Sequence, residues 1–261
     1  MMLPVMEEKR YLRTSELAKA VGIHPNTVRL YEQWGFLPTV ERSPKGYRRF
    51  TERHLDQLRL ARLALRCNVV GGDVRRAALE MIFQSAKGDL GGALELAYGF
   101  VATVRAERAQ AEAAAQFLER WASGAVTGTS SHLMRIGDAA RLLNTTIDSI
   151  RNWERNGLIE VPRDPQNGYR LFRADEIGGL RVIRMLIRSG YSAMAILRML
   201  TQFDLGQTEN LREVLDTPQP EEDVLYVSDH WLSTLVDADE IANQSVAMLE
   251  QMIAKVDIAP R

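Results

Sequence analysis

The hydrophobic positions between residues 90 and 118 step by alternating fours and threes along the chain. This period of about 3.5 residues is typical of a helix that packs along a partner helix in a coiled coil. The stripe consists of Leu90, Leu94, Ala97, Val101, Val104, Arg108, Ala111, Ala115 and Leu118, interrupted once by Arg108. A shorter stripe of the same kind consists of Ile241, Ser245, Met248, Met252 and Lys255. We therefore expect two pairing helices, over residues 89–122 and 237–257.

The sequence also contains two copies of one unit, offset by 122 residues. Residues 12–50 match residues 134–172 without gaps. The identical pairs are Arg13 with Arg135, Ala18 with Ala140, Arg29 with Arg151, Glu32 with Glu154, Gly35 with Gly157, Gly46 with Gly168, Tyr47 with Tyr169, Arg48 with Arg170 and Phe50 with Phe172. A repeat of this length indicates two copies of one structural module.

In the first copy, glycine, proline and a capping residue mark out a helix-turn-helix. Thr14 or Ser15 is expected to cap a first helix that ends at Gly22. A second helix is expected to begin at Pro25, where the missing N–H leaves no helical hydrogen bond unmade, and to run to about Trp34. Two short helices joined by a tight turn are typical of a DNA-binding module.

The second copy carries the same signals with two changes. Thr146 takes the capping position of the second helix, and Asn144 stands where the first copy has the glycine of the turn. Asparagine tolerates the left-handed backbone conformation, so we expect the turn to survive this change.

A wing and further helices complete each copy. Each second helix is followed by a short apolar segment, a polar loop with proline and the sequence Gly-Tyr-Arg-x-Phe, which we interpret as a two-stranded wing. Further helices are expected from about residue 52 to 66 and from about 174 to 188, each followed by a short helix. The predicted fold is therefore mainly α, with two tandem winged helix-turn-helix domains, each followed by a long helix suited to coiled-coil pairing. The segments around the pairing helices are a first winged domain at 8–88, a linker at 123–132, a second winged domain at 133–200 and an acidic insertion at 201–236.

Base-reading side chains are expected in the N-terminal half of each second helix, because only that end reaches base edges in the major groove. The candidates are Asn26, Thr27 and Arg29 in the first copy, and Asp148, Ser149 and Arg151 in the second. An amide has thus been exchanged for an acid at one base-reading position, which predicts two half-sites that differ. The candidates on the wings are Arg42, Lys45, Arg48 and Arg49, and in the second copy Arg163, Asn167 and Arg170.

The repeat also contains a pair of tyrosines and a pair of glutamates whose roles need separate interpretations. For Tyr47 and Tyr169, a core position and a phosphate contact both stay open. Glu32 and Glu154 would repel phosphate, so we expect each to form a salt bridge with a neighbouring basic residue.

The charge of the chain is distributed unevenly. The 261 residues carry a net charge of −1, yet residues 8–76 contain 15 Lys and Arg against 7 Asp and Glu, and residues 132–190 contain 10 against 7. Locally basic segments in an otherwise acidic chain fit contact with DNA phosphates.

Composition and motifs argue against several classes of protein. The single cysteine, Cys67, cannot form an internal disulfide, and the four histidines lack metal-ligand spacing. No catalytic triad order, phosphate-cradling glycine loop or paired catalytic carboxylates is discernible, so we predict no enzyme activity, no metal and no cofactor. No stretch approaches the roughly 20 apolar residues of a membrane span, so a cytoplasmic location without membrane contact is expected.

The sequence motifs resemble a known family. Arg-Leu-Tyr-Glu-x-x-Gly-Phe-Leu followed by Arg-x-x-x-Gly-Tyr-Arg-x-Phe resembles the N-terminal domain of the MerR-family (mercury-resistance type) transcription regulators, and the second copy resembles it with Arg-Asn-Trp-Glu-x-x-Gly-Leu-Ile and Gly-Tyr-Arg-x-Phe. The resemblance implies winged modules whose long helices pair antiparallel, distortion of double-stranded promoter DNA, and RNA polymerase as a partner. At matching positions it implies DNA contacts for Asn26, Thr27, Arg29, Arg42, Tyr47 and Arg48, and for Asp148, Ser149, Arg151, Arg163, Tyr169 and Arg170. The chain departs from the family in carrying two such domains and in lacking the cysteines of its metal-sensing members.

Two arrangements of the pairing helices stay open. A single chain can fold back on itself into an intramolecular pseudo-dimer, because the linker is rich in glycine, serine and threonine. The alternative is a homodimer with four winged modules.

The favoured function is a sequence-specific DNA-binding transcription regulator. The alternatives are an architectural or excisionase-like DNA-binding protein, and a small-molecule-binding or scaffold protein. Control by an effector is also open, since Tyr226 and Trp231 lie among acidic residues and could bind an organic cation. A packing insertion with a solvated acidic face is the alternative for this segment.

Overall fold

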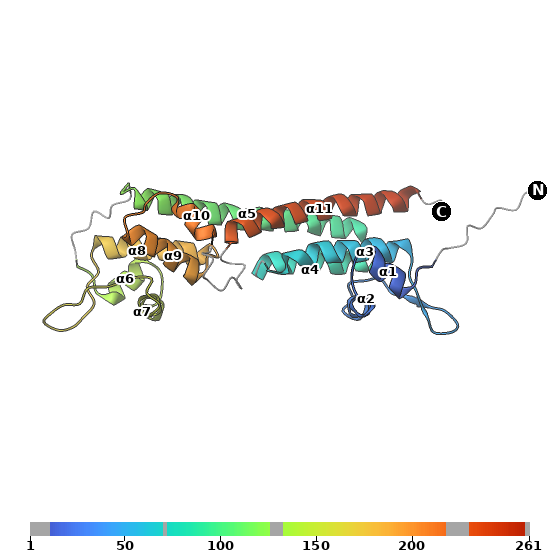
Figure 1. The fold of residues 1–261 in the computed structure, drawn as a ribbon, viewed down its shortest axis with the longest axis horizontal. Coiled ribbons are helices and arrows are strands. Elements are labelled where there is room, and N and C mark those ends of the chain that lie inside the picture. Colours follow the sequence, from blue (N-terminus) through green and yellow to red (C-terminus); the bar gives the residue numbers. More distant parts are fainter. Residues whose placement is uncertain (1–10, 70–71, 126–132, 218–229, 259–261) are drawn as a thin grey trace, which may run out of the picture. The chain divides into compact units, whose positions relative to one another are not determined.

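A computed structural model describes residues 11–69, 72–125, 133–217 and 230–258 of the chain (Figure 1). The chain divides into two compact units. Unit 1 comprises residues 1–105 and 237–261, and unit 2 comprises residues 106–236. Two long helices, α5 (Leu90–Ala122) and α11 (Trp231–Ile258), each contribute residues to both units.

Each unit contains one winged helix-turn-helix, as the repeat predicts. The remaining elements of unit 1 are α1 (Thr14–Ala20), α2 (Pro25–Gln33), β1 (Glu41–Arg42), β2 (Arg48–Arg49), α3 (Glu52–Ala64), the short 3-10 helix η1 (Leu65–Val69) and α4 (Gly72–Ala86). Those of unit 2 are α6 (Ile136–Leu142), α7 (Ile147–Arg155), α8 (Ala174–Arg188), α9 (Ala193–Asp204) and α10 (Leu211–Asp216). The mainly helical fold with two tandem modules is therefore confirmed. Within the four described ranges, no helix combines the length and the apolar character needed to cross a bilayer.

The first helix of the first module is capped differently from the prediction. Helix α1 has Arg13 as its N-cap residue, and the carboxylate of Glu16 accepts a hydrogen bond from the Arg13 backbone N–H at 2.6 Å. The prediction that Thr14 or Ser15 caps this helix is wrong, because both residues already lie inside its first turn. A carboxylate in the first turn serves as the acceptor and also interacts favourably with the helix dipole.

The predicted turns and second helices are confirmed. Helix α2 begins at Pro25, and the Thr146 hydroxyl accepts from the Ser149 backbone N–H at 3.0 Å at the start of α7. Gly22 has φ of +66°, and Asn144 has φ of +45° at the equivalent point. Both turns thus use a positive φ, which glycine adopts freely and asparagine tolerates.

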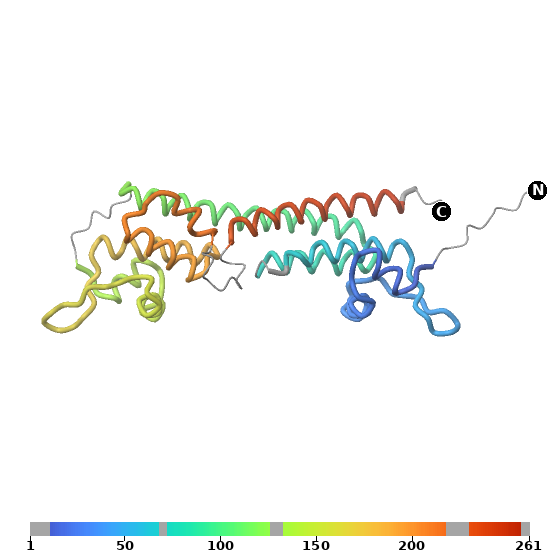
Figure 2. Tube along the Cα trace, in the orientation of Figure 1, coloured from blue at the N-terminus to red at the C-terminus, as the bar shows by residue number. Residues whose placement is uncertain are grey.

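Each wing is a short antiparallel hairpin beside the second, or recognition, helix of its module, which is α2 in unit 1 and α7 in unit 2 (Figure 2). Arg42 pairs with Arg48 in unit 1, whereas Arg163 pairs with Arg170 in unit 2. The second wing therefore has one residue more between its paired positions than the first. The gapless match at an offset of 122 residues is therefore wrong within the wing. Arg163 corresponds to Arg42, which is an offset of 121, and the extra residue of the second wing loop restores the offset of 122 at Arg170.

A backbone bridge fixes each wing to the start of its module. Leu12 and Phe50 exchange two backbone hydrogen bonds of 2.7 and 3.1 Å, and Met134 and Phe172 exchange two of 2.9 Å. Both phenylalanine side chains are fully buried. The end of the Gly-Tyr-Arg-x-Phe motif is thus an anchor in the hydrophobic core.

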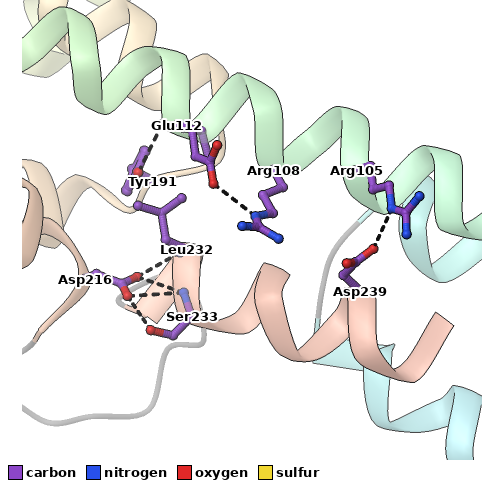
Figure 3. Close-up of polar contacts among 9 residues, drawn as sticks. Arg105, Arg108, Glu112, Tyr191, Asp216, Leu232, Ser233 and Asp239 are labelled. Atoms are coloured by element: carbon purple, nitrogen blue, oxygen red, sulfur yellow. Dashed lines mark hydrogen bonds and ion pairs between the residues drawn. The ribbon is translucent and has the colours of Figure 1, made fainter. Parts of the chain in front are cut away.

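The predicted seam of α5 is buried along most of its length. Buried seam positions are Ala97, Val101, Val104, Ala111, Ala115 and Leu118. Leu90 and Leu94 are only half-buried, and Ala93 is buried in their place. Arg108 interrupts the seam as predicted and forms an ion pair with Glu112 at 3.0 Å (Figure 3).

The seam of α11 differs in register from the prediction. Its buried positions in unit 1 include Ala238, Ala242, Ser245, Leu249 and Met252, which follow a strict alternation of fours and threes. The predicted Ile241, Ser245 and Met252 are buried, but Met248 is half-buried and Lys255 is exposed. The predicted and the observed sets both alternate by fours and threes and share Ser245 and Met252, so the period alone did not decide which face of the helix is buried. The helix also begins at Trp231, earlier than the predicted residue 237.

Within unit 1, α5 and α11 of the same chain pack antiparallel. The Tyr98 hydroxyl donates to Glu250 at 3.2 Å, and Arg105 pairs with Asp239 at 3.0 Å (Figure 3). Residue numbers rise along α5 as they fall along α11, which defines the antiparallel direction.

Within unit 2, the start of α11 closes the core. The indole N–H of Trp231 donates to the Ser189 carbonyl at 2.6 Å, and the Tyr191 hydroxyl donates to the Ala111 carbonyl at 3.3 Å. The Asp216 carboxylate accepts from the backbone N–H of Leu232 at 2.8 Å and so caps the helix (Figure 3).

The cap of α3 depends on a neutral histidine, which predicts a pH effect on unit 1. His54 Nδ1 lies 3.1 Å from the Thr51 backbone nitrogen that donates to it, and Nε2 lies 3.3 Å from the Thr39 carbonyl oxygen. Burial lowers the pKa of His54, and this effect outweighs the hydrogen bond to the Thr39 carbonyl, which raises the pKa; of the weaker charge effects, Arg53 lowers the pKa and Glu32 and Glu41 raise it. The unfolded chain therefore binds a proton on His54 at a higher pH than the folded chain does. The free energy of unfolding should be largest above the ordinary histidine pKa of about 6.5 and should fall as the pH drops below it. Thermal unfolding at pH 7.5 and 5.5 measures this, and a His54→Asn variant should show a smaller difference; an equal difference would contradict the assignment.

Candidate DNA interface

The N-terminal half of α2 presents polar side chains on its outer face. Asn26 and Arg29 are exposed and Thr27 is half-buried, while Val28 is fully buried and turns the helix toward its core. The Arg29 guanidinium donates to the Asn26 side-chain oxygen at 3.2 Å. The amide and the guanidinium therefore form one polar pair at the end of the helix that the sequence assigned to base reading.

Helix α7 presents the equivalent pair with a different charge. Asp148 and Arg151 form an ion pair at 3.3 Å, and the Asp148 side chain is 89% exposed. Ser149 is half-buried, and its hydroxyl lies 2.7 Å from the hydroxyl of the cap residue Thr146. Ser149 is thus tied into the helix cap, whereas Asp148 and Arg151 face solvent.

A glutamate on each recognition helix holds the base of its wing. Glu32 pairs with Arg42 at 2.9 Å and with Arg48 at 2.5 Å. Glu154 pairs in the same way with Arg170 at 2.6 Å and with Arg163 at 3.6 Å. The salt bridges predicted for both glutamates are confirmed, and their partners are the wing arginines.

This bracing gives a prediction with an unusual sign. Glu32→Gln removes a negative charge beside a proposed DNA surface, so simple repulsion would predict tighter DNA binding. We expect weaker binding instead, by about threefold to tenfold, because Arg42 and Arg48 lose the group that orients them. Fluorescence anisotropy with a bound duplex measures the change. Glu41→Gln is the matched control, since this exposed glutamate of β1 has no ion-pair partner among the described residues; tighter binding by Glu32→Gln would contradict the bracing role.

The same hollow lies between helix and wing in both units. In unit 1 it has a volume of about 820 Å³ and is lined by Arg13, Arg29, Tyr47, Arg48 and Arg49, among others. In unit 2 it has a volume of about 480 Å³ and includes the equivalent Arg135, Arg151, Tyr169 and Arg170. Tyr47 is 72% exposed and Tyr169 is 59% exposed, so neither is a core residue.

Arg13 and Arg135 were not assigned a role from the sequence. Both are exposed, and Arg135 lies over the Tyr169 ring with 5.4 Å between the guanidinium carbon and the ring centroid. The signal that points to both arginines is their recurrence at the same position of the repeat, just before the first helix of each module.

The remaining wing candidates differ between the units. Lys45 is exposed, and Arg49 lies 4.9 Å from the centroid of the Tyr11 ring. Asn167 donates to the Asp164 carboxylate at 2.7 Å and accepts from the Tyr169 backbone N–H at 3.0 Å. Asn167 therefore shapes the second wing turn.

The structure places one of the two effector candidates. Trp231 is buried, and its N–H is engaged with Ser189. Tyr226 lies outside the described residues, as does most of the predicted linker. Among the described residues no three His, Cys, Asp or Glu side chains lie close enough to hold a metal. Burial raises the pKa of the Cys67 thiol to about 11, against a smaller opposing effect of Arg66, so the thiol is protonated near neutral pH.

These features define a class of protein. A solvent-facing polar pair at the start of the second helix, braced by an arginine-bearing wing, is the arrangement of a winged helix-turn-helix, and the chain has it twice. The family model of the MerR HTH family regulatory proteins matches residues 12–68 and 134–202. The chain therefore carries two domains of this family in tandem.

Curated relatives match only part of the chain. The mercuric resistance operon regulatory protein of Bacillus cereus is 41% identical over 46 residues, which is 18% of this chain and 35% of that protein. The HTH-type transcriptional regulator CueR of Escherichia coli O157:H7 is 38% identical over 53 residues, which is 20% of this chain and 39% of that protein. The chain thus spans less than two fifths of the length of these relatives. No solved structure matches the chain.

Proposed function

We propose that this protein is a cytoplasmic, sequence-specific transcription regulator that binds double-stranded promoter DNA through both winged modules and distorts it. The observation that carries the proposal is the repeated pair of a polar residue and an arginine at the N-terminal end of each recognition helix. Such side chains read base edges in the major groove, while wing arginines hold phosphates and fix the register. The relatives named as regulatory proteins support the same function. By resemblance, RNA polymerase is the partner that uses the distorted promoter.

We further propose that one chain supplies both modules as a pseudo-dimer. The antiparallel contacts of α5 with α11 within unit 1 support this arrangement, since one chain provides both helices. Light scattering should give a mass near 29.4 kDa. A mass near twice that value would contradict the single-chain arrangement.

Arg29→Ala tests the proposal directly. Loss of one base-contacting arginine should weaken binding of the preferred duplex by about 1–3 kcal/mol, and unrelated duplexes much less. Binding is measured by anisotropy over a range of salt concentrations, because phosphate contacts make affinity fall with salt. Arg212→Ala is the matched control, since this exposed arginine lies on α10, outside both winged modules.

Transcription from a bound promoter separates regulation from an architectural role. A change in transcript level on adding the protein supports regulation. DNA bending without any change in transcript would favour the architectural alternative, and absence of salt-dependent DNA binding would overturn both.

A further inference from the structure

Unit 2 carries another hollow, of about 720 Å³, whose lining shares no residue with the proposed DNA surface. It lies between the C-terminal half of α5, the end of α6 and one face of α8. Part of its lining is apolar and accessible, since Leu142 is 49% exposed and Met185 is 36% exposed, and Phe117 is half-buried beside them. Exposed apolar side chains gathered in a hollow mark a surface that can bind an apolar group.

Three arginines of α8 line the same hollow, and no acidic residue is among the residues that line it. Arg181, Arg184 and Arg188 are spaced by three and four residues and so share one helix face. Arg184 donates to the Asn144 carbonyl at 3.4 Å, which is a weak contact. Within the described residues, none of the three forms an ion pair with a carboxylate.

Comparison of the two repeats shows what is missing in unit 2. The same three arginines occur in unit 1 as Arg59, Arg62 and Arg66. There Asp56, one turn earlier, pairs with Arg59 at 3.4 Å and with Lys255 at 2.6 Å.

The position equivalent to Asp56 is Gly178 in unit 2, and the Trp121 ring lies against it. A side-chain Cβ at Gly178 would lie only 3.0 Å from the Trp121 indole nitrogen. Unit 2 therefore keeps the arginine row, whereas the acid that pairs with the first arginine of the row in unit 1 is replaced by a glycine packed tightly against Trp121. Clustered guanidinium groups above an apolar floor favour an anionic group from outside the chain.

We infer that this hollow binds a small amphiphilic organic anion, namely an aliphatic or aromatic carboxylate free in solution. Arg184 and Arg188 hold the carboxylate, and Leu142, Met185 and Phe117 contact the apolar body. The hollow includes Leu143 and Asn144, which form the turn before recognition helix α7. A ligand there joins α5 to the helix-turn-helix of unit 2, so it is placed to alter DNA binding. This regulatory consequence rests on the proposed function, whereas binding of the anion does not.

Calorimetric titration of the full chain with decanoate tests the site. One decanoate should bind per chain, and the neutral 1-decanol should bind at least about tenfold more weakly. An Arg184→Gln/Arg188→Gln double variant should lose about tenfold or more in affinity. The matched control is Arg62→Gln/Arg66→Gln, which changes the equivalent arginines of unit 1 and should leave decanoate binding unchanged.

A second variant guards against a folding defect in the first. Met185→Glu keeps every arginine and places a carboxylate among them on an exposed helix position, so it should abolish decanoate binding at an unchanged melting temperature. Equal binding of decanol and decanoate, equal loss in both arginine double variants, or full binding by Met185→Glu would each overturn the inference.

Anisotropy with promoter DNA, with and without decanoate, separates this inference from the proposed function. Retained DNA binding without any decanoate binding defeats the inference alone. If the unaltered chain does not bind decanoate and the Arg184→Gln/Arg188→Gln variant loses DNA affinity, these arginines contact DNA phosphates. This result would also defeat the inference. Decanoate binding without any DNA binding leaves the site intact and defeats the proposed function.

Discussion

Replacing Trp231 by alanine should destabilise the protein by about 3–5 kcal/mol, the usual cost of removing a buried tryptophan side chain. Trp231 is only 8% exposed, and its indole N–H donates to the Ser189 carbonyl at 2.6 Å. It also fills the space beside Gly190, where a Cβ would lie 2.5 Å from the ring. Truncation therefore opens a cavity and leaves a buried carbonyl without its donor. Urea denaturation followed by circular dichroism measures the change.

Trp34→Ala is the matched control for this experiment. Trp34 is 52% exposed at the end of α2, so its loss should cost about 1 kcal/mol or less. If Trp231→Ala lowers the free energy of unfolding by as little as Trp34→Ala does, Trp231 is a surface residue and stays a candidate for effector binding. The large difference is expected because burial, and not residue type, decides the cost.

The repeat made most of the fold predictable. Glycine, asparagine and proline have strong local preferences, so Gly22, Asn144 and Pro25 predicted the turns and the start of α2. The hydrophobic period predicted α5 at residues 89–122, against Leu90–Ala122 in the structure. Local signals suffice where a residue's own backbone preference determines the conformation.

The errors arose where neighbours decide the outcome. The seam of α11 uses Ala238, Ala242 and Leu249, whereas the predicted stripe used Ile241 and Met248 at the same spacing, so contacts with neighbouring helices decide between the two faces. The wing register shifted by one residue because the pairing of Arg163 with Arg170 depends on backbone hydrogen bonds that a sequence comparison does not contain.

The candidate site was predictable in its residues and not in its connections. The sequence indicated Arg48 and Arg170 as DNA contacts and Glu32 and Glu154 as salt-bridge partners, without joining the two predictions. The structure joins them, since each glutamate holds the arginine 16 residues later at 2.5 or 2.6 Å. These wing arginines therefore have a positioning role within the protein in addition to the proposed phosphate contact.

The exchange of Asn26 for Asp148 should make the two half-sites of the operator differ in base sequence. An asparagine pairs well with adenine through its N6 and N7 groups, whereas a carboxylate can only accept and so favours the amino group of cytosine. Each preference is worth about 1–3 kcal/mol. Sequencing of duplexes selected from a random pool should therefore give adenine in the half-site bound by unit 1 and cytosine at the equivalent position of the half-site bound by unit 2.

Reciprocal variants provide the control for this last prediction. Asp148→Asn should change the selected base in the half-site bound by unit 2 to adenine and so make the operator symmetric at this position. Asn26→Asp should weaken binding to the original operator by about tenfold or more. The double exchange of both residues should restore an asymmetric operator with its two half-sites reversed, because each pair with Arg29 or Arg151 keeps its geometry. Selection of the same base at both half-sites by the unaltered chain would show that these positions do not read DNA, even if the protein binds it.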